Sequence, residues 1–79
     1  MAYFDFLWTD DAIEHLAEHG LTPDDFDHVL LNPTKQGTSR SSGRPAAWGY
    51  TDDGRYIIAI YEMADDVTIL PVTAYEISQ

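Results

Sequence analysis

Apolar residues change their spacing along the chain, and the changes separate a helical part from a strand-rich part. Residues 3–8 alternate loosely and are rich in aromatic side chains, which is typical of a strand. Residues 9–31 show the spacing of amphipathic helices, and the residues after 45 return to strand patterns. The pattern therefore predicts one strand, two helices and a final group of strands.

The first predicted helix begins after Thr9, an N-cap residue followed by two aspartates that the helix dipole favours in a first turn. Ile13, Leu16 and Ala17 form its apolar stripe, so we expect this face to pack on the core. Gly20 predicts the end of the helix, because glycine readily adopts the left-handed conformation that closes many helices.

The second predicted helix begins with a capping box, in which Thr22 is the N-cap and Asp25 lies three residues later. Pro23 suits the first helical position because its ring already fixes a helical φ. Phe26 opens an apolar stripe, and the Asn-Pro pair at 32–33 stops the helix.

Three strands are predicted after the helices, at residues 46–51, 56–63 and 67–75, and two Asp-rich turns join them. The middle strand is apolar on both faces, so its outer face needs a cover that a dimer contact would provide. Pro71 cannot donate to a sheet ladder and therefore predicts an edge or a bulge. Residues 35–41 are a candidate fourth strand.

These elements predict a single α+β domain, residues 1–79, with a two-helix hairpin packed on a three- to four-stranded antiparallel meander in two layers. So small a core favours a homodimer or another protein partner. The absence of cysteine excludes disulfides, thiolate metal sites and a cysteine nucleophile. No signal-peptide pattern or membrane-spanning run is present, so we expect a cytoplasmic protein without membrane association.

Charge is unevenly distributed. The segment Thr34–Pro45, which we call the basic hinge, holds three of the four Lys and Arg residues and none of the fourteen acids. Removing its charge of +3 from the total of -10 leaves -13 on the other 67 residues. Such acidity argues against general adhesion to nucleic acid, although it also fits a salt-adapted host. An anion would have to bind at the basic hinge.

Arg40 and Arg44 flank small hydroxyl residues and a glycine within the hinge. Two guanidinium forks on a backbone that a ligand can approach closely suit a phosphate or a carboxylate. The alternative is an exposed connector whose arginines pair with the chain's own acids, Asp52 and Asp53 among them.

Further candidates lie on the predicted strands. Arg55 and Glu62 stand at the two ends of the 56–63 strand and are either mates in a sheet-face site or ordinary strand-end charges. Tyr75 is either a general acid or a packing residue with a wet tip. Trp8 and Trp48 are predicted as core or rim residues rather than as stacking platforms for bases.

Asp11, His15 and His19 lie on one side of the first predicted helix, opposite Ile13, because residues four apart differ by roughly 40° around a helix. Such spacing holds a divalent metal or supplies a base with its orienting carboxylate. A solvated helix face is the simpler interpretation, and we predict neither a metal nor a cofactor.

Short motifs follow one another in a fixed order: Trp-Thr-Asp-Asp at 8–11, Glu-His-Gly at 18–20, Leu-Thr-Pro-Asp-Asp at 21–25, Asn-Pro at 32–33, Gly-Arg at 54–55, Tyr-Glu at 61–62, and the run 69–74. In this order they resemble the BrnT-like toxins of the RelE/ParE superfamily. The resemblance implies the fold predicted above and cleavage of RNA, free or on the ribosome, through attack of a 2′-hydroxyl on the neighbouring phosphate. It also implies a partner antitoxin in a type II toxin-antitoxin system.

The resemblance further implies a metal-independent endoribonuclease, with cationic residues on the phosphate, a base and an acid. The candidates are Arg40, Arg44 and Arg55 for the phosphate, Glu62 or His19 as the base, and Tyr75 as the acid. Two departures stand against it: residues 40–45 replace a His-Ser-Gly-Glu loop, and Thr-Ala-Tyr at 73–75 replaces Ser-Ala-Arg. The arginine-rich helix that follows in the family has no counterpart within these 79 residues. The alternative is therefore a non-catalytic module of the same fold that binds a protein or dimerises.

Overall fold

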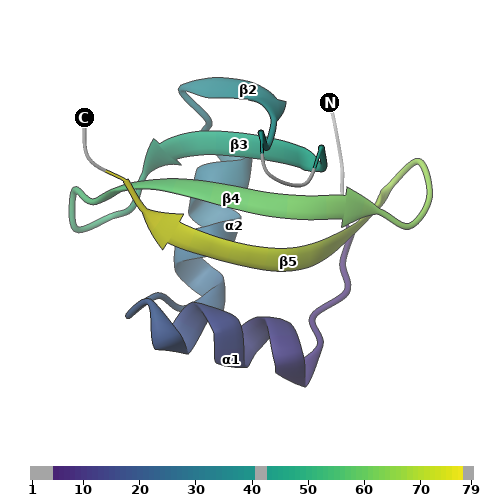
Figure 1. The fold of residues 1–79 in the computed structure, drawn as a ribbon, viewed down its shortest axis with the longest axis horizontal. Coiled ribbons are helices and arrows are strands. Elements are labelled where there is room, and N and C mark those ends of the chain that lie inside the picture. The colour runs from purple at the N-terminus through teal and green to yellow at the C-terminus, as the bar shows by residue number, and fades with distance from the viewer. Residues whose placement is uncertain (1–4, 41–42, 78–79) are drawn as a thin grey trace.

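The computed structural model describes residues 5–40 and 43–77. Within them the chain forms a two-helix hairpin and a five-stranded sheet (Figure 1). The elements are β1 (Asp5–Phe6), α1 (Asp10–Glu18), α2 (Pro23–Leu31), β2 (Lys35–Thr38), β3 (Pro45–Tyr50), β4 (Tyr56–Met63) and β5 (Thr68–Glu76). The predicted α+β class and the predicted order of the elements are confirmed.

The strand order is β1-β5-β4-β3-β2, so the meander from β2 to β5 is antiparallel throughout. The N-terminal strand joins the meander by pairing parallel to β5. It has only two residues, shorter than the predicted 3–8, and residues 3 and 4 lie outside the described part. The candidate strand in the basic hinge is confirmed as β2, which forms one edge of the sheet.

Both helices begin as their sequences predict. The Thr9 side chain accepts a hydrogen bond from the Ala12 N–H at 3.1 Å. The capping box of α2 is complete, because Thr22 and Asp25 each bond the other's backbone N–H with a side-chain oxygen. Gly20 follows α1 with a φ of 71°, a left-handed conformation in which a side chain would be strained.

The buried face of α1 differs from the prediction. Ala12 and Leu16 are the buried residues of this helix, whereas Ile13 is 40% exposed and Ala17 is also exposed. The reason is the position of the helix: α1 runs alongside β5 (Figure 1) and covers it with a narrow strip of residues four apart. The wider stripe expected from the sequence would need a broader sheet surface beneath it.

The main core lies between α2 and the sheet. Phe26 and Val29 of α2 are fully buried against small and β-branched strand residues such as Ile57. The edge of the Trp8 ring meets Phe26, with centroids 5.2 Å apart. A Cβ at Gly49 would lie 3.2 Å from Val29, so glycine lets α2 approach β3 closely.

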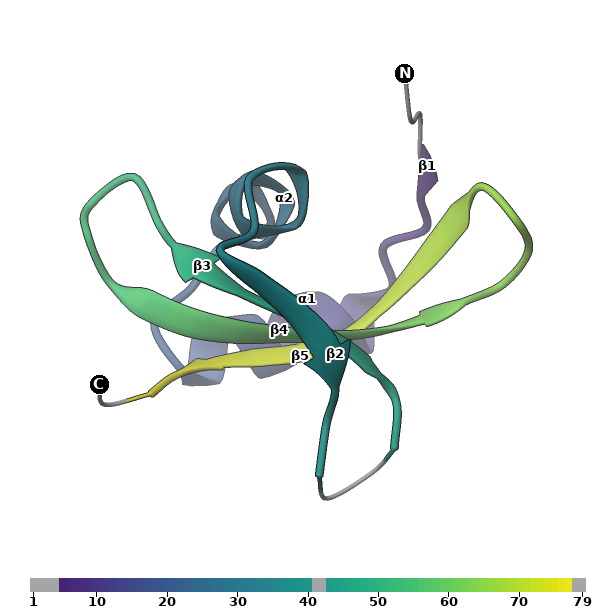
Figure 2. The same cartoon turned by 90° about the horizontal axis from the view of Figure 1, so that it is seen from above.

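The central strand β4 is buried on both faces within one chain, whereas the sequence predicted burial of its outer face only under an added cover. Its Ile57 and Ala59 face the helices, and Ile58 and Ile60, each 5% exposed, belong to a second cluster on the opposite face. Figure 2 shows α2 on one side of the twisted sheet. Half-buried neighbours from the sheet and the residue after it complete the second cluster: Trp48, Val72, Tyr75 and Ile77. The dimer contact proposed as a cover stays a prediction.

A β-bulge interrupts the pairing of β4 with β5. Ile60 pairs with Thr73, but the next residue, Tyr61, pairs with Pro71, so Val72 is an extra residue. The bulge predicted from Pro71 is thereby confirmed. It leaves Val72 on the same face as Tyr75, in the second cluster.

Candidate functional site

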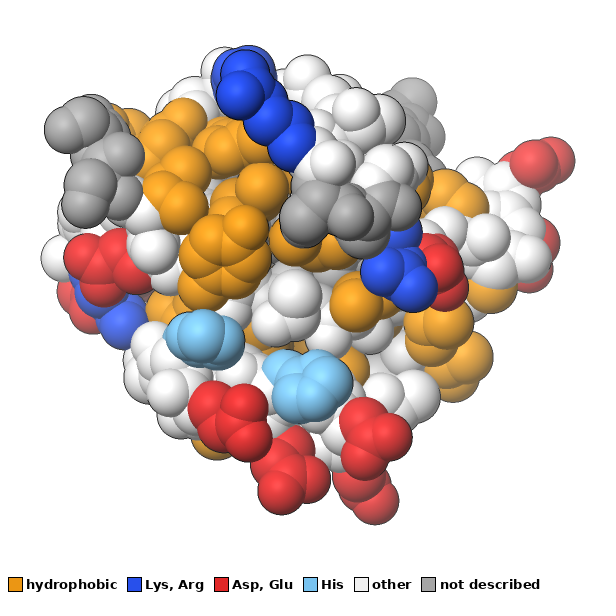
Figure 3. Space-filling model, viewed as in Figure 1, with side chains coloured by type: hydrophobic (Ala, Val, Ile, Leu, Met, Phe, Trp, Pro, Cys, Tyr) orange, Lys and Arg blue, Asp and Glu red, His pale blue; other side chains and the backbone are white. Residues whose placement is uncertain are grey.

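The face of the sheet away from α2 carries the candidate site, and we call it the open face. Apolar side chains occupy its centre, with cationic side chains at its margins and two histidines of α1 below (Figure 3). A hollow of about 430 Å³ lies on this face between β2, β3 and the C-terminal end of β5. The residues that define its chemistry are Lys35, Arg40, Trp48 and Tyr75.

One wall of the hollow is built by the β2–β3 pair. Lys35 lies opposite Trp48 in the register, and its ammonium sits 4.9 Å from the indole centroid, within the range of a cation–π interaction. Gly37, two residues along β2, keeps the strand close to the same ring, since a Cβ there would lie 3.5 Å from it. Trp48 is half-buried at the rim, in agreement with its prediction.

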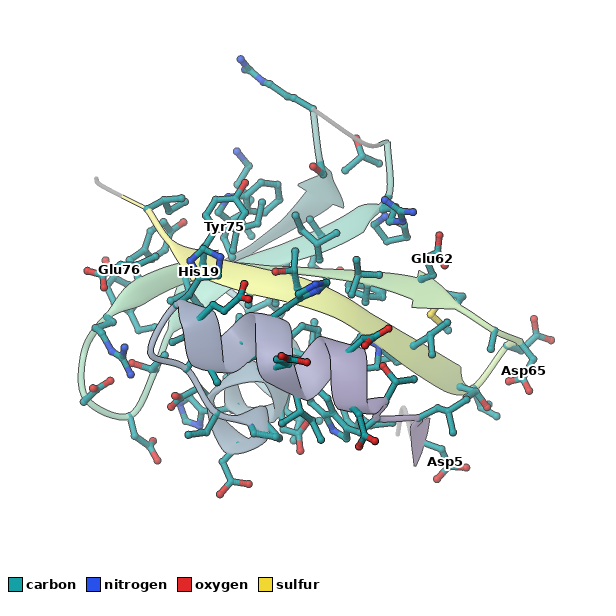
Figure 4. All side chains as sticks on the ribbon, turned by 60° about the horizontal axis from the view of Figure 1, so that its bottom comes forward. Asp5, His19, Glu62, Asp65, Tyr75 and Glu76 are labelled. Atoms are coloured by element: carbon teal, nitrogen blue, oxygen red, sulfur yellow. The ribbon has the colours of Figure 1, made fainter. Side chains whose placement is uncertain are left out.

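The other wall brings two predicted site residues together. Tyr75 of β5 lines the hollow, and the His19 ring, at the C-terminal end of α1, lies 6.0 Å from the Tyr75 ring (Figure 4). Arg40 lines the same hollow from the basic hinge. Arg40 and Tyr75 thus line one hollow, and His19 lies next to Tyr75 without lining it. Side chains of these three types are able to bind an anion and to move protons.

Arg44 and Glu62 form an ion pair of their own. Their Nε and Oε1 atoms are 2.8 Å apart, and both side chains are nearly half exposed. Figure 4 shows Glu62 at the opposite end of the sheet from His19 and Tyr75. Glu62 therefore stands apart from the other proposed proton-transfer groups, and the pair fixes part of the hinge to β4.

Arg55 joins the β3–β4 turn to the corner between the helices. Its guanidinium donates to the Gly20 carbonyl at 2.9 Å and to the Asp53 carboxylate at 3.0 Å, and it lies 3.5 Å from Asp25. The hydrogen bond with Asp53 is the main reason that the pKa of Arg55 is raised. Arg55 and Glu62 are seven positions apart in the sequence, which is roughly 23 Å of extended chain. The two residues do not form a joint sheet-face site.

The side of α1 that carries Asp11 and His15 lies next to the sheet as well as facing solvent. His15 Nδ1 lies 3.4 Å from the Val72 carbonyl oxygen on β5. Among residues 5–40 and 43–77, no three His, Asp or Glu side chains form a group suited to a metal ion. Asp11, His15 and His19 therefore do not belong to such a group.

Asp27 on α2 is the one described residue with a buried side-chain oxygen, Oδ1, that lacks a hydrogen-bond partner. Its burial raises the pKa of the carboxyl, and the charge of Asp24 raises it further. A hydrogen bond with the Trp8 side chain acts in the opposite direction. This residue lies on the helix side of the sheet and not at the hollow.

Two residues of the hollow were not singled out from the sequence. Lys35 was noted only as part of the basic hinge, and Trp48 only as a packing residue. The available signal was the alternation of β2, in which Lys35 and Gly37 share a face beside an aromatic residue of the next strand.

No protein family, curated protein or solved structure was found to match this chain. The resemblance to BrnT-like toxins therefore stays a prediction that rests on the motifs quoted above. In the part of the chain that the structure describes, no helix is long and apolar enough to cross a membrane.

Proposed function

We propose that the protein is a BrnT/RelE-like toxin that cleaves RNA at the open-face hollow. The observation that supports this proposal best is that Arg40 and Tyr75 line one hollow and that His19 lies next to Tyr75. These residues come from three separated parts of the chain, so sequence proximity does not account for their meeting. The bound phosphate would take the place where Lys35 and Arg40 supply positive charge.

The reaction divides between three roles. Neutral His19 accepts the proton of the RNA 2′-hydroxyl as its oxygen forms a bond to the neighbouring phosphorus. Arg40 and Lys35 stabilise the extra negative charge on the phosphate oxygens in the transition state. The phosphorus–O5′ bond breaks and the Tyr75 hydroxyl donates a proton to the leaving oxygen. The products are a 2′,3′-cyclic phosphate and a 5′-hydroxyl end.

Relative to the sequence interpretation, the proposal assigns new roles to three residues. Arg55 is a structural residue, since its donors are bound to the turn and the helix corner. Arg44 and Glu62 form an ion pair away from Tyr75 and act on the hinge conformation. His19, rather than Glu62, is the proposed base, because it adjoins Tyr75.

The test is cleavage of end-labelled RNA by purified protein, with and without ribosomes, and detection of the cyclic phosphate end. Arg40→Ala is expected to slow cleavage about 100-fold, the typical cost of removing one transition-state donor. Tyr75→Phe keeps the ring and is expected to slow cleavage as well. Arg44→Ala removes an arginine of the same hinge that does not line the hollow, and it is expected to slow cleavage less than Arg40→Ala does. Absence of wild-type cleavage on free and ribosome-bound RNA would refute the proposal.

A second candidate is a non-catalytic module that binds a protein through the open face. It is favoured by the apolar centre of that face and by the engagement of Arg44 and Arg55 in ion pairs within the chain. A homodimer or a cognate antitoxin is the proposed partner. Sedimentation velocity of wild type and Val72→Asp tests the homodimer: a dimer that the aspartate dissociates supports it, and a concentration-independent monomer eliminates it.

A further inference from the structure

The outer edge of β2 offers a row of backbone hydrogen-bonding groups. β2 is the last strand of the sheet order, and all four of its residues are exposed. No strand within residues 5–40 or 43–77 pairs with its outer side. Such an edge is a template for an added strand unless charge, proline or a bulge protects it.

The hydrogen-bonding direction of β2 follows from its register with β3. Ser39 lies opposite Arg44 and donates its N–H to the Arg44 carbonyl at 2.8 Å. Because bonded pairs alternate along an antiparallel ladder, Gly37 and Lys35 also face β3. Gln36 and Thr38 therefore direct their backbone groups outward, towards any added strand.

Charge indicates which partner suits this edge. Residues 28–51 contain no Asp or Glu, although the whole chain carries fourteen. Lys35 begins β2, and Arg40 follows it two residues after its end. The two cations bracket the free edge, and opposite charges at cross-strand positions stabilise a pair of strands. An acidic strand is therefore favoured and a basic one is disfavoured.

The same charges argue against a second copy of this chain. Two β2 strands paired antiparallel would bring the Lys35 of one copy towards the Arg40 end of the other, so that like charges meet. Each copy would also bring a net charge of -10. The occupant is consequently an acidic segment of a different polypeptide.

We propose that the β2 edge binds an extended acidic peptide as a sixth strand, with backbone bonds to Gln36 and Thr38 and charge contacts to Lys35 and Arg40. Lys35 and Arg40 would serve both this edge and the proposed RNA site, but Gln36 belongs to the edge alone, because it does not line the open-face hollow. Bound there, the peptide would lie along the β2 rim of that hollow.

The probe is a short fluorescein-labelled peptide in which glutamate alternates with valine, and binding is measured by anisotropy in low salt. Gln36→Pro removes one outward N–H and is expected to weaken binding about tenfold or more. Gln36→Ala keeps that N–H and is the matched control, expected to bind as wild type does. Circular dichroism and thermal unfolding verify that each variant is folded.

The role of the two cations in peptide binding is tested by reversing their charge. The Lys35→Glu, Arg40→Glu double variant is expected to lose the acidic peptide and to bind the corresponding peptide with lysine in place of glutamate. Equal binding of both peptides by wild type, or equal binding of the acidic peptide by folded Gln36→Pro and Gln36→Ala, would overturn the proposal. Gln36→Pro is expected to cleave RNA at the wild-type rate while it loses the peptide. Peptide binding and RNA cleavage are therefore measured independently, and either proposal can fail without the other.

Discussion

The two faces of the sheet are built by the same strands but are closed in different ways. On the helix side, Phe26, Val29 and Ile57 are fully buried between α2 and the strands. On the open face, the half-buried rings of Trp48 and Tyr75 cover the isoleucines of β4 without a helix above them. The difference teaches that one face supplies most of the packing, while the other leaves side chains accessible for binding.

The largest expected effect is on the helix side. Phe26→Ala should lower the free energy of unfolding by about 3–5 kcal/mol, because it empties a fully enclosed site. Urea unfolding followed by tryptophan fluorescence measures the change. Since a small domain has little stability to lose, Phe26→Leu serves as a milder companion with an expected loss below about 1.5 kcal/mol. A negligible loss in both variants would show that this face is not the main core.

The matching change on the open face should cost less. Trp48→Ala is expected to lower the free energy of unfolding by about 1–2 kcal/mol, because the ring is only half-buried and removes less apolar area. The same urea titration applies, with the fluorescence of the remaining Trp8 and circular dichroism as probes. If Trp48→Ala lost as much unfolding free energy as Phe26→Ala, but only at high protein concentration, another chain would have to cover the open face in solution.

A smaller effect concerns the ion pair on the open side. A double-mutant cycle of Arg44→Ala and Glu62→Ala should give a coupling energy of about 0.2–1 kcal/mol, because both side chains are nearly half exposed. The coupling should fall in molar salt. A coupling that salt leaves unchanged would indicate a more buried pair than the structure shows.

The smallest effect is expected at Asp27 on the helix side, whose buried Oδ1 atom has no hydrogen-bond partner among the described residues. The pKa of Asp27 lies above its ordinary value, so folding favours the neutral carboxyl. Its ionisation costs stability as pH rises through the folded pKa, and this cost is absent below the unfolded pKa. Asp27→Asn should therefore raise the unfolding midpoint at neutral pH and leave it unchanged in acid. Thermal unfolding across pH measures the difference, with Asp66→Asn as a control at an exposed turn residue that does not act on Asp27.

Most of the fold could be predicted from local signals. The capping residues of both helices, the bounds of β4 and the bulge at Pro71 all depend on neighbouring residues and on strand geometry. The buried face of α1 could not be predicted in the same way. Whether Ile13 or Ala12 is buried depends on where the helix meets β5, which is set by contacts distant in sequence.

The candidate site could be predicted only in part. Its residue types were apparent: Arg40 and Tyr75 line one hollow, and His19 lies next to Tyr75. The ion-pair partners of Arg44 and Arg55 were not apparent, because the chain has fourteen acidic residues and the sequence does not show which of them lies near each guanidinium. The selection of Glu62 by Arg44 follows from the packing of the hinge against β4.

The bulge in β5 has a consequence for how this strand tolerates change. Ile69, Pro71 and Ala74 are all buried, at intervals of two and then three residues, so the inside–outside alternation changes phase at Val72. Loss of that single extra residue would leave a regular ladder with β4, in which Ile69, Pro71 and Ala74 share one face and Tyr75 stays on the open face. The bulge is therefore the place in β5 where the strand can lose one residue, whereas a deletion elsewhere in β5 would move part of the strand to the other face.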